Sequence, residues 1–136
     1  MMQILLIEDN PGDILLVRRA LAEHVIAHEL HVVRDGGLAL DFIRRIGQPD
    51  GPPCPDVVLL DLNLPKVQGH EILAELRKHP GCARTPVIVV SSSDAEREKA
   101  LMSGLGVSRY FRKPSDLGAF LQLGAVVREV TADRAR

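Results

Sequence analysis

The strongest indication of the fold is the sequence Val57-Val-Leu-Leu-Asp-Leu-Asn-Leu-Pro65. Its four consecutive apolar residues predict a strand buried on both faces, because a half-buried strand would alternate apolar and polar residues. The acid that follows stands where this strand ends, and the Asn-Leu-Pro sequence behind it favours a turn. A strand of this kind is typical of the centre of a parallel sheet that helices cover on both sides.

Four further strands are expected beside this one, and segments with helical periodicity separate the five strands along the chain. Two of the four are nearly continuous in apolar residues and should lie centrally, whereas the other two carry polar residues and suit sheet edges. The central pair is Gln3–Ile7 and Val87–Val90, and the edge pair is Glu29–Val33 and Arg109–Phe111. This alternation predicts an α/β domain with a five-stranded parallel sheet.

The intervening segments predict five helices. Three are expected at Asp13–His24, Gly37–Ile46 and Gly69–Lys78, a fourth from near Asp94, and a last one after Ser115. Proline or glycine stands beside most of these boundaries, where it interrupts the helical pattern.

Two surface features leave alternatives open. The last predicted helix has a second apolar row at Leu123, Val126 and Val130, which is either a broadened core stripe or a homodimer contact. Such a dimer would use the face of the fourth helix, fifth strand and last helix. The loop 47–55 is rich in proline and glycine and is either an exposed connection or a surface for a partner.

The composition limits the class of protein. With 136 residues, 46% hydrophobic and 26% charged, the chain predicts one globular domain at 1–130 and a short polar tail at 131–136. No appended output domain is therefore expected. A net charge of -1 without a basic run disfavours direct DNA binding.

The expected location is the cytoplasm. No apolar stretch has the length of a membrane span, and the first residues lack the features of a secretory signal. Cys54 and Cys82 lie far apart in the sequence and suggest neither a zinc site nor a redox pair, which fits a reducing compartment.

Polar residues follow four of the predicted strands. Glu8 and Asp9 come after the first strand, Asp61 after the third, Ser91 after the fourth and Lys113 after the fifth. In an open parallel sheet the carboxyl ends of the strands form the edge where functional groups gather. We therefore expect three acids, a hydroxyl group and a lysine to meet there.

Three neighbouring carboxylates repel one another unless a cation compensates their charge. Mg²⁺ suits such a site because it binds oxygen ligands and keeps several waters. Glu8, Asp9 and Asp61 are therefore predicted to bind Mg²⁺. Asp61, at the tip of the central strand, is the best candidate for a nucleophile.

Together these residues resemble the receiver domains of two-component response regulators. The matching pieces are Glu8-Asp9, Asp61-Leu-Asn-Leu-Pro-Lys-Val-Gln-Gly69, Ser91 and Lys113-Pro114, in the family's order and spacing. The resemblance covers about residues 3–128. It implies a flavodoxin-like doubly wound fold with strand order 2-1-3-4-5 and helices on both faces of the sheet.

The resemblance also implies roles for individual residues. Asp61 would accept a phosphoryl group from the phosphohistidine of a sensor histidine kinase, while Lys113 and Ser91 would contact the phosphoryl oxygens. The implied ligands of Mg²⁺ are Glu8, Asp9, Asp61 and the main-chain carbonyl of Asn63. Ser92 and Ser93 adjoin Ser91, so a slip of one residue at the strand end leaves the choice of hydroxyl open.

Further features are implied by the family pattern. Tyr110 matches an aromatic switch residue that swings inward on activation and so alters a surface for a downstream protein target. The Lys113–Pro114 peptide bond is expected to be cis. The sequences Glu-Asp-Asn-Pro-Gly-Asp and Asp-Leu-Asn-Leu-Pro-Lys are similar to a single-domain subgroup that is paired with phytochrome-type sensor kinases.

Three other functions compete with this interpretation. A haloacid-dehalogenase-type phosphatase would need a second aspartate two residues after Asp61, where this chain has Asn63. A flavodoxin-like nucleotide or flavin binder would need a glycine-rich loop after the first strand, and none is present. A scaffold that is never phosphorylated would lack the acids or the lysine. A signalling protein rather than an enzyme is therefore expected.

Overall fold

A parallel sheet forms the centre of the protein, and the computed structural model describes residues 1–64, 67–92 and 96–132. The strands are β1 (Met2–Ile7), β2 (His28–Val33), β3 (Val57–Asp61), β4 (Val87–Ser91) and β5 (Val107–Arg112). Their order across the sheet is β2-β1-β3-β4-β5, and every neighbouring pair is parallel. The predicted five-stranded sheet and its strand order are therefore confirmed.

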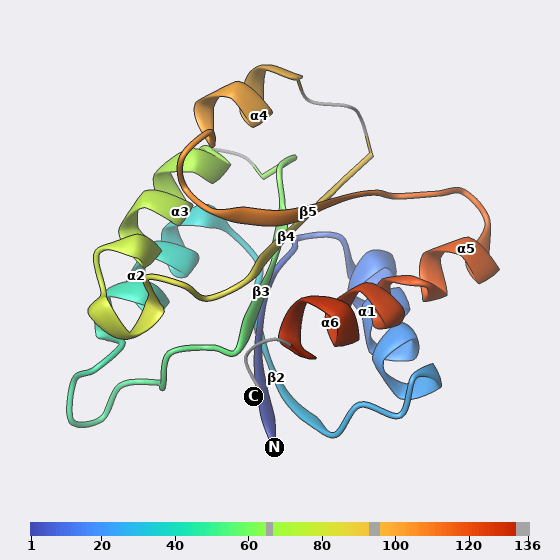
Figure 1. The fold of residues 1–136 in the computed structure, drawn as a ribbon, viewed down its shortest axis with the longest axis horizontal. Helices are drawn as coiled ribbons and strands as arrows, with labels where there is room; N and C mark the ends of the chain where they lie inside the picture. The colour runs from blue at the N-terminus through green and yellow to red at the C-terminus, as the bar shows by residue number, and fades with distance from the viewer. Residues whose placement is uncertain (65–66, 93–95, 133–136) are drawn as a thin grey trace.

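Helices cover both faces of this sheet (Figure 1). α1, α5 and α6 lie on one face, α2 and α3 lie on the other, and α4 lies next to α3. Their bounds are α1 Pro11–Glu23, α2 Gly36–Arg45, α3 Gly69–Arg77, α4 Glu96–Leu101, α5 Leu117–Leu121 and α6 Leu123–Ala132. Within the described ranges, no helix has the length and apolar character needed to cross a membrane.

Alternate residues of the strands supply two separate core clusters. In β3, Val58 and Leu60 pack with buried residues of α2 and α3, whereas Val57 and Leu59 pack with those of α1 and α6. All five residues of β3 are buried, as the uninterrupted apolar run predicts for a strand between two helical layers. This packing fixes the position of Asp61 at the end of the strand.

The start of α1 differs from the expected start at Asp13. The helix begins at Pro11, because proline suits the first helical position and Asn10 caps the helix. The Asn10 side chain accepts a hydrogen bond from the Asp13 N–H at 3.0 Å. Asp13 therefore lies in the first turn of α1, close to the carboxyl end of β1.

The last predicted helix is two helices, α5 and α6, which meet at Gln122. Leu123 is fully buried, and Val126 and Val130 are half-buried against the same core cluster. The second apolar row thus contributes to the core, which favours the broadened stripe over an exposed dimer contact. α6 extends to Ala132, and residues 133–136 of the expected tail lie outside the described residues, as does the expected start of α4 at Asp94.

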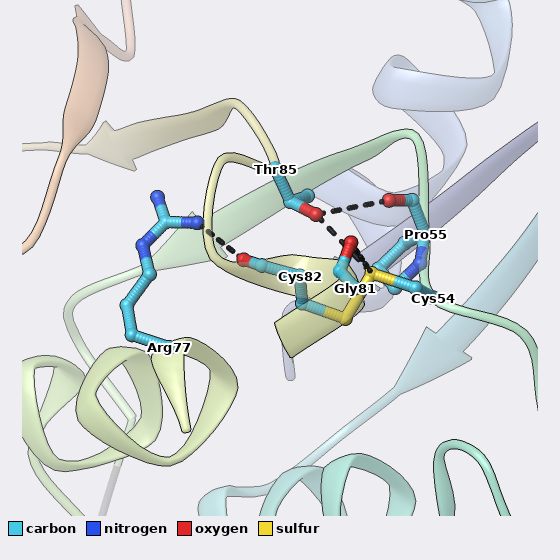
Figure 2. Close-up of a disulfide and its surroundings, with 6 residues drawn as sticks. All are labelled: Cys54, Pro55, Arg77, Gly81, Cys82 and Thr85. Atoms are coloured by element: carbon cyan, nitrogen blue, oxygen red, sulfur yellow. Dashed lines mark hydrogen bonds between the residues drawn. A yellow bond between two sulfur atoms is a disulfide. The ribbon is translucent and has the colours of Figure 1, made fainter. Parts of the chain in front are cut away.

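Cys54 and Cys82 form a disulfide bond, so the expectation that they make no redox pair is wrong (Figure 2). The bond joins the loop before β3 to η1, a short 3-10 helix at Pro80–Cys82 before β4. Sequence spacing did not reveal the pair because the two cysteines are separated by 28 residues and only meet where two loops end side by side. The cysteines consequently no longer support a reducing compartment.

Arg77 makes hydrogen bonds near the disulfide, at the amino ends of the strands. Its guanidinium donates hydrogen bonds to three main-chain carbonyls: Leu105 at 2.8 Å, Cys82 at 2.8 Å and Gly106 at 3.0 Å. The end of α3 is thereby joined to the segments that precede β4 and β5, and this brace lies beside the disulfide (Figure 2). Both features lie near the amino ends of the strands.

Candidate functional site

The predicted acids meet at the opposite end of the sheet. Ile7 of β1 is paired with Leu60 of β3, so Glu8 and Asp61, the next residues, lie level with each other. Both are buried, at 2% and 3% exposure, while Asp9 is exposed. One carboxylate oxygen from each of these three acids lies within 4.8 Å of the others. The expected convergence of the acids is therefore confirmed.

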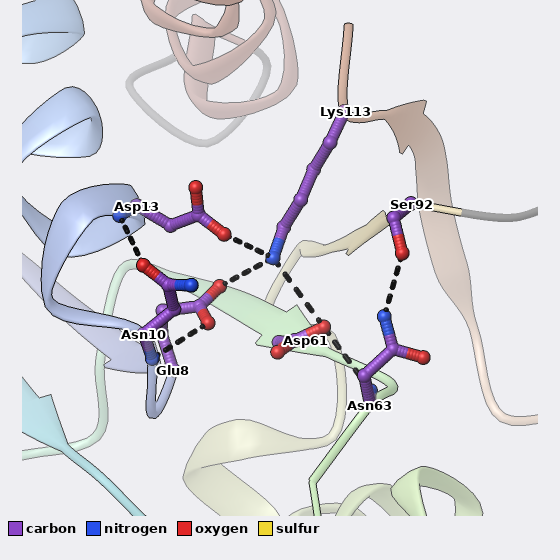
Figure 3. Close-up of polar contacts among 7 residues, drawn as sticks. All are labelled: Glu8, Asn10, Asp13, Asp61, Asn63, Ser92 and Lys113. Atoms are coloured by element: carbon purple, nitrogen blue, oxygen red, sulfur yellow. Dashed lines mark hydrogen bonds and ion pairs between the residues drawn. The ribbon is translucent and has the colours of Figure 1, made fainter. Parts of the chain in front are cut away.

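Lys113 reaches into this cluster from the end of β5 (Figure 3). Its main-chain N–H donates to the Ser91 carbonyl at 2.7 Å, which anchors the residue to the end of β4. The ammonium group lies 2.9 Å from Glu8 Oε2 and 3.7 Å from Asp61 Oδ1. The lysine thus lies over the acids, as the sequence predicts.

Asp13 also belongs to this cluster, and sequence reasoning treated it only as a helix start signal. Its Oδ2 accepts a hydrogen bond from Lys113 Nζ at 2.7 Å. The two residues are 100 positions apart, and their contact depends on how α1 packs beside the sheet. The only sequence signal was the placement of an acid in the first turn of a helix that follows the strand bearing Glu8.

The structure places the candidate hydroxyl groups differently from one another. Ser91 is the last residue of β4 and is 5% exposed. Ser92 is exposed, and its Oγ accepts a hydrogen bond from Asn63 Nδ2 at 2.9 Å. Ser92 lines a hollow of about 260 Å³ together with the acids, Asn63 and Lys113. Ser93 lies outside the described residues.

Two expectations about β5 and the residues after it have different outcomes. Tyr110 lies on β5 and is 43% exposed, with Lys99 Nζ 5.0 Å from its ring centroid. Its ring therefore points outward, and the proposed inward swing stays a prediction.

The Lys113–Pro114 bond is trans, so the expectation of a cis bond is wrong. Trans is the lower-energy isomer before proline when packing does not enforce cis.

Burial and charge shift the pKa values of two groups in the site. Burial is the main cause that raises the pKa of Glu8 from 4.5 to about 7; the Lys113 hydrogen bond opposes this rise and the nearby Asp61 adds to it. Burial would lower the pKa of Lys113, but its hydrogen bonds with Asp13 and Glu8, together with the negative charges of Asp61 and Glu8, raise it. Burial and the neighbouring Asp61 therefore disfavour the charged form of Glu8 despite the hydrogen bond from Lys113.

The Glu8 shift predicts that the metal-free protein becomes less stable as pH rises. Glu8 holds its proton in the folded state up to about pH 7 but in the unfolded state only to about 4.5. The contribution of Glu8 to the free energy of unfolding is thus complete below pH 4.5 and is lost as pH rises through 7. The loss should approach about 3 kcal/mol, since one pKa unit corresponds to about 1.4 kcal/mol.

Urea unfolding in a chelator at pH 5 and pH 8 would measure this loss. Other groups also titrate over this range, so the comparison is with Glu8→Gln, which keeps the size and the polarity of the side chain. The variant should be less sensitive to pH than the natural protein. An equal decline in both proteins would contradict the assignment to Glu8.

Comparisons with known proteins agree with the fold and the site. The family model for the response regulator receiver domain matches residues 4–123. Response regulator Rcp1 from Synechocystis sp. is 40% identical over 114 residues, which is 84% of this chain and 78% of that protein.

Solved structures are similar over nearly the whole chain. The phosphorylated cyanobacterial phytochrome response regulator RcpA has a TM-score of 0.83 and 38% identity, covering 99% of this chain and 96% of that one. The Mn²⁺-bound form of Rcp1 has a TM-score of 0.80 and 35% identity, covering 95% and 93% of the two chains. The match of the family model over most of the sequence, together with these relatives, shows that this chain belongs to the response regulator receiver domain family.

Proposed function

We propose that this protein is a phosphorylatable signalling switch that accepts a phosphoryl group on Asp61 from a sensor histidine kinase in a Mg²⁺-dependent reaction. The observation that carries the proposal is the meeting of three carboxylates with one lysine at the carboxyl edge of the sheet. Asp61 lies at the tip of β3, a strand whose five residues are all buried. The chain would act by changing a binding face rather than by turning over an external substrate.

The residues of the site fit a divalent cation. Glu8, Asp9 and Asp61 each bring one carboxylate oxygen within 4.8 Å of the others, and burial together with the charge of Asp61 raises the pKa of Glu8. The donors are all oxygen atoms, which is the set that Mg²⁺ prefers. We infer that Glu8, Asp9, Asp61 and the main-chain carbonyl of Asn63 hold it. When bound, the ion supplies positive charge to the transferring phosphoryl oxygens and brings the acids together without repulsion.

The reaction follows from the position of Asp61. One carboxylate oxygen attacks the phosphorus of the kinase phosphohistidine, forming a P–O bond as the P–N bond breaks and its electron pair returns to the imidazole. Little covalent work is required of the protein, since phosphoryl transfer depends on positioning and on positive charge near the oxygens. Lys113 Nζ, at 3.7 Å from Asp61 Oδ1, can reach an incoming phosphoryl oxygen by a small movement toward Asp61.

The phosphoryl group on Asp61 would then change the surface of the protein. A serine at the end of β4 would donate a hydrogen bond to a phosphoryl oxygen and move toward it. We propose that Tyr110, now outward beside Lys99, would follow into the space that this movement opens. The face of α4, β5 and α5 would thereby change for a downstream protein or for a second copy of this chain.

The proposed donor is a kinase of the phytochrome type. The basis is that RcpA is described as a cyanobacterial phytochrome response regulator. A bacteriophytochrome response regulator, RtBRR, is also similar, at 36% identity and a TM-score of 0.75 over 96% of this chain and 78% of that one. A cytoplasmic location would follow if the donor domain of the kinase is cytoplasmic.

The test of the proposal is the uptake of a phosphoryl group from a small donor such as acetyl phosphate. With Mg²⁺, intact-mass measurement should show one added phosphoryl group that mild base releases, as expected of an acyl phosphate. With a chelator the adduct should be absent. Failure to form the adduct with any small donor and Mg²⁺, or an adduct that base does not release, would overturn the proposal.

Two serine variants would decide which hydroxyl group serves the phosphoryl group. Ser91 is nearly buried at the strand end, while Ser92 lines the hollow with Asn63. The family pattern predicts that Ser91→Ala slows phosphoryl uptake about tenfold, the usual contribution of one well-placed hydrogen bond. Ser92→Ala should alter the rate less, because the family pattern assigns the role to Ser91. A larger effect at Ser92 would assign the role to that residue instead.

A further inference from the structure

Asp13 is the nearest ionic partner of Lys113 in this site. Lys113 Nζ lies 2.7 Å from Asp13 Oδ2, 2.9 Å from Glu8 Oε2 and 3.7 Å from Asp61 Oδ1. The first two contacts are hydrogen bonds, and the third is too long to be one. Figure 3 shows the lysine entering between Asp13 on one side and Asp61 on the other. The ammonium group is therefore held toward α1 when Asp61 carries no phosphoryl group.

Local structure fixes Asp13 in this position. It stands in the first turn of α1, and its main-chain N–H donates to the Asn10 side chain at 3.0 Å. The side chains of Asp13 and Lys113 are only 23% and 11% exposed, so their contact is partly shielded from water. A charge-assisted hydrogen bond in such a place is stronger than one between neutral groups or on an open surface.

A phosphoryl group on Asp61 would compete with Asp13 for the lysine. One of the three donors of the ammonium group is left over, but the hydrogen bonds to Glu8 and Asp13 hold the group 3.7 Å from Asp61 Oδ1. To bind a phosphoryl oxygen closely, the group must move toward Asp61 and away from Asp13. A contact that is stronger in one state than in the other shifts the equilibrium toward the first state.

We propose that Asp13 is a positioning residue that retains Lys113 in the unphosphorylated state and so weakens the binding of a phosphoryl group at Asp61. This inference rests on the function proposed above. It assigns a role to an acid outside the three that surround the metal site. It also gives a direction: removing the charge of Asp13 should favour the phosphorylated form.

Beryllofluoride, which mimics a phosphoryl group on a carboxylate, would test this with Asp13→Asn at saturating Mg²⁺. The variant should bind the mimic about tenfold more tightly, the order of one charge-assisted hydrogen bond that no longer has to be given up. Without the mimic it should melt at a lower temperature than the natural protein, because a shielded ion pair is lost. A purely structural role predicts that affinity and melting temperature fall together.

Two further variants serve as controls. Glu71→Gln removes another acid from a helix first turn, that of α3, and should leave the affinity for beryllofluoride unchanged. Asp13→Glu keeps the charge and should bind the mimic as the natural chain does. If the natural chain binds the mimic but Asp13→Asn binds it equally or more weakly, the inference about Asp13 is overturned and the proposed function is not. If the natural chain does not bind it at all, the proposed function fails as well.

Discussion

The Asp61→Asn variant is expected to acquire no phosphoryl group under conditions in which the natural chain acquires one. An amide oxygen is a much weaker nucleophile than a carboxylate oxygen, and its substitution also removes one acid from the metal site. Asp61 is the one acid of the group that ends the central strand, 3.7 Å from Lys113. Intact-mass spectra after incubation with acetyl phosphate and Mg²⁺ would measure the difference.

Loss of uptake in this variant should not arise from loss of the fold. The charge of Asp61 and its hydrogen bond with Glu8 both help to raise the pKa of Glu8. Removing that charge relieves repulsion, so the metal-free variant should be at least as stable as the natural protein at pH 8. Asp50→Asn changes an exposed acid in the loop before β3 and should be phosphorylated normally. Full uptake by Asp61→Asn would contradict the assignment.

Removing the disulfide is expected to have the largest effect on stability. In the chain-entropy model, closing a loop of 28 residues contributes about 3.5 kcal/mol to the free energy of unfolding. Cys54→Ser should therefore unfold at markedly lower urea concentration than the natural protein under oxidising conditions. Cys54 is the better site for the change because it is half-buried, whereas Cys82 is fully buried.

Reduction of the natural protein provides the matched comparison. A reductant should lower the stability of the natural chain toward that of Cys54→Ser and leave the variant nearly unchanged. Phosphoryl uptake by the folded variant should be retained, because the disulfide lies at the end of the sheet opposite Asp61. Two titratable thiols in the natural protein as purified without reductant, and no response to reductant, would contradict the bond.

The strands and the acids could be predicted because each follows from a local pattern. Uninterrupted apolar runs identify the central strands, and an acid directly after such a run must lie at the carboxyl edge. That Glu8 and Asp61 lie together could therefore be predicted from the ends of their strands alone. Lys113 could be placed on the same ground, since it follows the fifth strand.

Two of the missed features, the role of Asp13 and the disulfide, depend on where separate segments pack. Asp13 meets Lys113 only because of how α1 packs beside the sheet, and no periodicity encodes that distance. Cys54 and Cys82 meet because the loop before β3 lies beside η1. The choice between Ser91 and Ser92 turns on a single residue at a strand end, where patterns locate boundaries least well.

The contacts at the two ends of the sheet differ in what can replace them. At the amino ends, a covalent bond and the three hydrogen bonds of Arg77 join the segments, and neither depends on a bound ion or ligand. At the carboxyl ends, the bonds of Lys113 are to carboxylates that can exchange it for other cations or ligands. The amino ends of the strands are thus held by permanent contacts and the carboxyl ends by exchangeable ones. A rearrangement around Lys113 therefore need not disturb the packing at the opposite end of the sheet.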